Sequence, residues 1–146
     1  MKIIFLSLGL ACAALLSAPA MSQTMPASDA LYQSFGQKAG IAKVIDNAVD
    51  RWMADPRIQP FFKDAVPQRL KYSLTEQVCQ LTGGPCDYKG QDMKAAHAAM
   101  GVNKAAFNNL VEGLQLAMDA EKIPFTVQNR LLALLAPMNR EIITVR

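Results

Sequence analysis

Apolar residues recur at helical spacing along most of this chain, and that pattern is what most constrains its fold. The clearest case lies within 107–118, where the apolar residues are Phe107, Leu110, Val111, Leu114, Ala117 and Met118. Such spacing is typical of one face of an amphipathic helix. Similar faces occur over 41–54, 67–81 and 124–142, whereas no alternating run flanked by turn residues indicates a strand. We therefore predict an all-α protein.

Capping and helix-breaking residues set the expected boundaries. We expect a brief helix from Ser28 to Phe35, a turn over 36–40, and a helix that ends near Ala54. Further helices are expected to begin at Pro67, Asp92, Asn103 and Pro124, with Gly83-Gly84 ending the first of these and Pro137 kinking the last. The expected buried faces are Leu70, Leu74, Val78 and Leu81 with Gln77 on the same side, and Leu131, Leu134, Leu135, Met138 and Ile142.

The first twenty residues resemble a secretory signal. Lys2 supplies a basic start, residues 3–16 are apolar, and Ala18-Pro19-Ala20 is a small-x-small cleavage site, with Ser22 as a second cut position. The apolar run falls short of the roughly 20 residues that a membrane span needs. We expect a signal peptide over 1–20, a linker over 21–29 and a single domain over 30–146, exported to the periplasm without a stable membrane span.

The charge balance excludes a strongly cationic protein. Lys and Arg number 15 against 12 Asp and Glu, and removing Lys2 leaves 14. The charges are scattered and no basic face with interleaved aromatics appears, so a nucleic-acid partner is not expected.

Two cysteines lie outside the signal, Cys79 and Cys86, seven positions apart across a glycine-proline turn. In an oxidising compartment they are expected to form a disulfide that ties a helix end to the following loop. The alternative is a metal or redox pair, but no CxxC motif or second cluster accompanies them. CxxCH is also absent, which argues against covalent c-type haem attachment.

His97 is the only histidine of the sequence. It follows a long glycine-containing loop, and Met93, Ala96 and Met100 make its neighbourhood apolar. A lone histidine beside alanines is commonly an ordinary core or surface residue. The same surroundings suit an imidazole bound to the iron of a flat apolar cofactor such as haem. Local evidence leaves both interpretations open.

Several short motifs resemble a known family. They are Met53-Ala54-Asp55-Pro56, Phe61-Phe62, LTGGP over 81–85, Tyr88-Lys89-Gly90, MKxxHxxMG over 93–101, and the Gly101-Val102 that follows. In this order they resemble the group 1 truncated haemoglobins, and the resemblance runs from about Ala30 to Ile143. It implies the two-on-two helical globin fold.

The resemblance also implies a cofactor and a set of site residues. One non-covalent haem b is expected, with His97 as the protein ligand of its iron and Phe62 packed on the haem. The remaining pocket-lining positions correspond to Leu70, Leu74, Met93, Met100, Val102, Phe107, Leu110, Leu131 and Leu135. Arg69, Lys71 and Lys94 are candidates for contacting the haem propionates. For each residue except His97, an ordinary core or surface role is the alternative.

The distal side departs from the family pattern. Members often place a tyrosine and a glutamine where this chain has Val49 and Leu74, with Leu70 at the pocket entrance. Bound O₂ carries partial negative charge, so a missing donor costs about 1–3 kcal/mol of binding. CO and NO depend less on such a donor.

These expectations favour a haem protein that reversibly binds O₂, NO or CO in gas binding, transport or detoxification, rather than an enzyme. One alternative is an enzyme of the NO dioxygenase type, which requires an electron-donor reductase as partner. Another is an exported helical binding module without a cofactor, in which His97 is a core residue.

Overall fold

The computed structural model describes residues 29–145, which form helices and connecting loops without a strand. The predicted signal peptide, the Ser28 cap and the linker up to residue 28 lie outside the described residues. The helices are α1 (Ala30–Ser34), α2 (Gln37–Ala54), η1 (Gln59–Phe62), α3 (Pro67–Leu81), α4 (Met93–His97), α5 (Lys104–Ala120), α6 (Phe125–Leu135), η2 (Ala136–Met138) and α7 (Asn139–Ile142).

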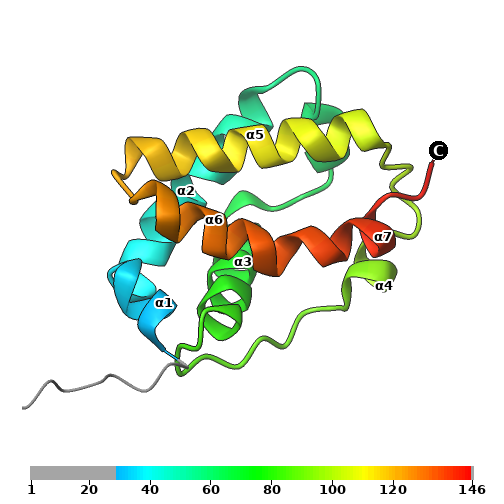
Figure 1. Ribbon diagram of the computed structural model, residues 1–146. Coiled ribbons are helices and arrows are strands. Elements are labelled where there is room, and N and C mark those ends of the chain that lie inside the picture. The colour runs from blue at the N-terminus through cyan, green and yellow to red at the C-terminus, as the bar shows by residue number, and fades with distance from the viewer. Residues whose placement is uncertain (1–28, 146) are drawn as a thin grey trace, which may run out of the picture.

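Two long helices, α2 and α5, organise the fold. Helix α2 packs against both α3 and α5, and the short α4 packs against α7. Helix α5 and the α6–α7 segment run in opposite directions, and α4 lies beside α7 near the C-terminus (Figure 1). Fully enclosed side chains include Ile41, Val44, Val49, Ile58, Met118 and Leu131. Among residues 29–145, no helix has the length and apolar character needed to cross a bilayer.

Helix α2 starts earlier than expected. The predicted turn over 36–40 is wrong, because the helix begins at Gln37 and includes Gly40. Gly36 turns the chain in the left-handed region, with φ of 77°, and Gln37 follows it with φ of 62°. Gly40 then lies so close to the preceding chain that a Cβ there would collide with the Phe35 carbonyl oxygen. Gly40 therefore allows the backbone of α2 to pass close to the Phe35 carbonyl group.

The buried face of α3 also differs from the prediction. Its most buried residues are the consecutive Thr75, Glu76, Gln77, Val78 and Cys79, whereas Leu70, Leu74 and Leu81 are only half-buried. Glu76 is held in this environment by an ion pair with Lys38 of α2, which raises the pKa of the Lys38 ammonium. The C-terminal half of α3 is thus enclosed, and its N-terminal half keeps apolar side chains partly accessible.

The predicted helix caps at Asp92 and Asn103 are confirmed. The Asn103 side chain accepts a hydrogen bond from the Ala106 amide at the start of α5, and Asp92 does the same for Ala95 in α4. Pro137 interrupts the last helix as a 3₁₀ turn between α6 and α7. On α6, Leu131 is buried as expected, but Leu134 is 39% exposed and does not belong to the inner face.

Cys79 and Cys86 are joined by a disulfide, with their Cα atoms 5.8 Å apart. Cys79 is fully buried near the end of α3, and Cys86 lies in the loop that leads to α4. The bond therefore ties this loop to α3. The loop is held further by Gln80, whose side-chain oxygen accepts a hydrogen bond from the Tyr88 amide.

Candidate functional site

His97 ends the five-residue helix α4, and its ring is half-buried. The Nδ1 atom lies 2.8 Å from the carbonyl oxygen of Met93, one turn earlier. Because a carbonyl oxygen only accepts hydrogen bonds, Nδ1 must be the protonated nitrogen. In the neutral form of this ring, Nε2 carries the lone pair and is the nitrogen that can bind a metal.

Helix α4 contains no fully buried residue. Its placement depends on the Asp92 cap, on packing against α7, and on one contact to α3. That contact is a hydrogen bond from the Gln77 side-chain amide to the Met93 sulfur, at 3.6 Å. A short helix with so little burial is marginal by itself, so these contacts determine where the His97 ring lies.

Except for Met93, the other predicted site residues belong to one apolar cluster, but they differ in burial. Val102 and Leu131 are 7% and 0% exposed and lie in the closed core. The half-buried residues packed against that core are Phe62, Leu70, Leu74, Met100, Phe107, Leu110 and Leu135. Met93 is likewise half-buried. These half-buried residues come from η1, α3, α4, α5, α6 and the segment after α4, so elements distant in sequence contribute partly accessible apolar side chains.

The predicted distal residues are all aliphatic. Val49 on α2 is fully buried, while Leu70 and Leu74 on α3 are half-buried. None of these three side chains can donate a hydrogen bond or transfer a proton. Tyr72, which lies between the two leucines in the sequence, is 66% exposed and points away from the core.

The three residues predicted to contact the haem propionates lie in different environments. Lys71 is paired with acids of α2, with its Nζ atom 2.8 Å from Asp50 and 3.9 Å from Asp46. Arg69 and Lys94 are exposed. Lys71 is therefore engaged in an interhelical ion pair.

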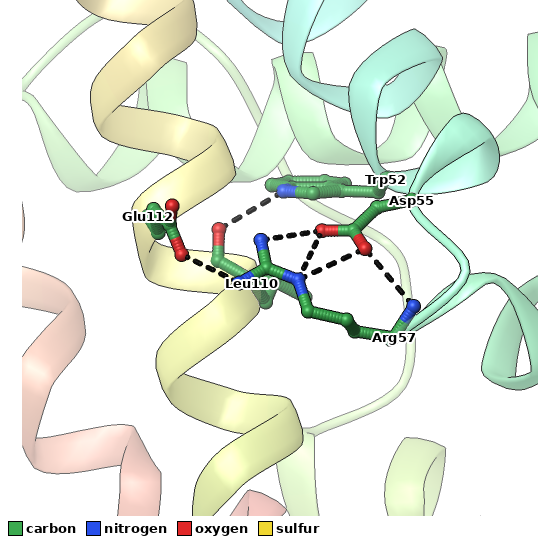
Figure 2. Close-up of polar contacts among 5 residues, drawn as sticks. All are labelled: Trp52, Asp55, Arg57, Leu110 and Glu112. Atoms are coloured by element: carbon green, nitrogen blue, oxygen red, sulfur yellow. Dashed lines mark hydrogen bonds and ion pairs between the residues drawn. The ribbon is translucent and has the colours of Figure 1, made fainter.

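Trp52 is a residue whose role was not predicted. Its indole ring is 4% exposed and stacks on Phe62, with ring centroids 6.0 Å apart and an interplanar angle of 8°. Its Nε1 atom donates a hydrogen bond of 2.9 Å to the Leu110 carbonyl oxygen on α5 (Figure 2). Gly113 makes room for the ring, since a Cβ there would lie 2.6 Å from Nε1. Trp52 thus contacts two predicted pocket residues, Phe62 and Leu110.

Arg57 forms a second link between α2 and α5. Its guanidinium binds both carboxylate oxygens of Asp55 and also Glu112 on α5, at 2.7 to 3.1 Å (Figure 2). The Arg57 side chain and backbone amide together hold the pKa of Asp55 below its usual range, and the two carboxylates raise the pKa of Arg57. The helix periodicity could not reveal this pair, because Arg57 and Glu112 are 55 residues apart.

This ion pair predicts a dependence of stability on acid pH. A carboxyl whose folded-state pKa is lowered contributes stability that is fully present above its unfolded value, near 3.8, and is lost as the pH falls through the folded value. We expect Asp55→Asn to destabilise the protein at neutral pH, with the difference from the parent shrinking below about pH 4. Urea unfolding of both proteins at several pH values measures this difference in the free energy of unfolding.

Asp64→Asn is the matched control, because Asp64 is exposed and lies 4.0 Å from Lys63. A difference between parent and Asp55→Asn that stays constant down to about pH 2 would contradict the prediction.

A surface depression of about 510 Å³ lies elsewhere, beside Tyr32 and the Gly83-Gly84 turn, and none of the predicted site residues lines it. This depression therefore does not belong to the candidate site around His97.

Comparison with known proteins identifies the family that shares this architecture. Residues 30–144 match the family model of bacterial-like globins. A group 1 truncated haemoglobin, GlbN of Mycolicibacterium paratuberculosis, is 30% identical over 119 residues, covering 82% of this chain and 86% of that protein. The Fe(III) form of truncated haemoglobin from Tetrahymena pyriformis superimposes with a TM-score of 0.73 at 22% identity, covering 80% of this chain and 98% of that one. The cyanomet 2/2 haemoglobin of Synechococcus sp. PCC 7002, which has covalently attached haem, gives 0.72 at 18% identity, with coverages of 77% and 97%.

The fold and the family match define a globin, and the chain belongs to the bacterial-like globin family. Within it, the chain is a member of the group 1 truncated haemoglobins, and the predicted all-α two-on-two fold is confirmed. Membership of this family implies a haem cofactor with iron and diatomic gases as ligands.

Proposed function

We propose that this protein binds one haem b non-covalently through His97 Nε2 and reversibly binds a diatomic gas on the opposite face. The hydrogen bond from His97 Nδ1 to the Met93 carbonyl oxygen carries the proposal, because it leaves Nε2 free and fixes the ring orientation. Half-buried leucine, methionine and phenylalanine side chains of several helices supply the apolar surface that a haem requires. When bound, the haem iron supplies one open coordination position for the gas.

The chain's own side chains support non-covalent binding. The Synechococcus protein is described with covalently attached haem. Among residues 29–145 of this chain, the two cysteine sulfurs are joined to each other, and the one histidine is His97. No further thiol or imidazole in that range is available for attachment to the haem periphery.

The aliphatic distal residues favour reversible ligand binding over catalysis. Val49, Leu70 and Leu74 are aliphatic and offer no acid or base to move a proton. We therefore propose a role in gas binding, transport or detoxification. NO dioxygenation with an electron-donor reductase remains the enzyme alternative, and no contact of the described residues favours it.

We further propose export to the periplasm. The disulfide between Cys79 and Cys86 supports this part of the proposal, since disulfides persist in oxidising compartments. The signal-like pattern of residues 1–20 agrees with it. Mass spectrometry of periplasmic material should then find a mature chain that begins at Met21 or Gln23.

The test of haem binding is an absorption spectrum of the parent and of His97→Ala, each oxidised, reduced, and reduced with CO. An intense haem band that shifts with CO in the parent, and is lost or restructured in the variant, is expected. A parent that cannot be reconstituted with haem, or a variant with an unchanged spectrum, would overturn the ligation by His97.

A further inference from the structure

Gln77 is a buried polar side chain of α3. It is 9% exposed and lies on α3 one turn after Leu74, a residue of the proposed pocket. Its amide nitrogen has the Met93 sulfur as its hydrogen-bond acceptor, at 3.6 Å. Thioether sulfur is a weak acceptor, so burying this amide costs more free energy than burying an aliphatic residue of similar size. Stability alone therefore does not account for a glutamine at this position.

The contact has a geometric consequence for His97. Met93 is the first residue of α4, and its carbonyl oxygen accepts the hydrogen bond from His97 Nδ1. Holding the Met93 sulfur anchors the first turn of α4 to α3, and that turn carries the carbonyl group that His97 contacts. Within residues 29–145, the Gln77–Met93 bond is the one hydrogen bond that joins α3 to α4.

We infer that Gln77 is a positioning residue that acts through Met93 to set the hydrogen bond, and hence the ligand strength, of His97. This inference rests on the proposed ligation of haem iron by His97. Partners of a metal-ligating histidine fix its orientation and raise its basicity, and changing them typically alters metal affinity by 10–100-fold. Gln77 acts one contact further out, so we expect its removal to speed haem loss by about tenfold, the lower end of that range.

The experiment is resonance Raman spectroscopy of the ferrous haem-loaded protein, read at the iron–histidine stretching band. Gln77→Leu and Met93→Leu should each move this band, and the double variant should match the single ones, because both substitutions remove the same contact. The C–O stretching band of the CO complex should stay in place. The free energy of unfolding of Gln77→Leu without haem should be equal to or above that of the parent, which a merely structural glutamine would not give.

Gln80→Leu is the matched control. Gln80 lies on the same helix and accepts a hydrogen bond from Tyr88 in the loop before α4, but no hydrogen bond joins it to Met93. An iron–histidine band unmoved by Gln77→Leu, moved equally by Gln80→Leu, or shifted additively in the double variant would overturn the inference. A shift of the C–O band alone would also overturn it, by assigning Gln77 to the gas ligand.

Failure of the proposed function gives a different result. A parent without an iron–histidine band shows that His97 is not the ligand, and both proposals then fall. A parent with the band that is insensitive to Gln77→Leu removes only the role of Gln77. If Gln77→Leu does not fold, Met93→Leu still removes the contact while Gln77 is kept.

Discussion

Leu74→Gln should slow the release of O₂ by about tenfold or more, because it introduces a hydrogen-bond donor at a position that we propose faces the bound gas. A hydrogen bond to a partly charged acceptor contributes about 1.5–3 kcal/mol, and about 1.4 kcal/mol corresponds to a factor of ten. Leu74 suits the substitution, since it is half-buried and glutamine is close to it in volume. Stopped-flow replacement of O₂ by CO measures the dissociation rate.

Leu74→Met is the control for this prediction, because methionine fills similar space without a donor. CO release should change little in either variant, since CO depends less on a distal donor. Equal slowing of O₂ release by methionine and glutamine would show that packing is responsible, and an unchanged rate in Leu74→Gln would place residue 74 away from the bound gas.

Trp52→Ala should destabilise the fold by about 3–5 kcal/mol, the usual cost of truncating a large buried aromatic residue. The indole ring is 4% exposed, stacks on Phe62 and donates to the Leu110 carbonyl oxygen. Trp52→Phe keeps an aromatic ring for the stack and removes the N–H donor, so a smaller loss of about 1–3 kcal/mol is expected. Urea unfolding followed by far-UV circular dichroism measures both values.

Phe125→Ala provides the comparison, because Phe125 is 69% exposed at the start of α6. Exposed substitutions of this kind change stability by about 0.5 kcal/mol or less. If Trp52→Ala cost no more than Phe125→Ala, the stack and the link to α5 would contribute nothing to the fold.

Local chemistry was predictable from the sequence where one residue determines one turn. Asp92 and Asn103 cap their helices through a side-chain oxygen, and Pro137 breaks the last helix, as expected. The turn before α2 was predicted too long because two glycines were read together. Gly36 turns the chain, while Gly40 lies inside the helix and permits a close approach.

Contacts between helices were less predictable, because apolar spacing identifies a face and not its partner. Gln77 was placed on the side of α3 that bears Leu70 and Leu74, but its contact with Met93 depends on the path of the intervening loop. The bond from Trp52 to Leu110 spans 58 residues and the pair of Arg57 with Glu112 spans 55. Such contacts follow from the packing of α2 against α5, and the spacing of apolar residues does not predict which helices pack together.

The stack of Trp52 on Phe62 gives the protein a built-in optical reporter. Trp52 is the one tryptophan of the sequence, so its intrinsic fluorescence comes from a single place. Phe62, against which it lies, is the residue proposed to pack on the haem. Haem absorbs in the range where tryptophan emits, so a haem bound behind Phe62 should quench this emission by energy transfer, and unfolding should restore it. Cofactor loading and unfolding can thus be followed in the unlabelled chain.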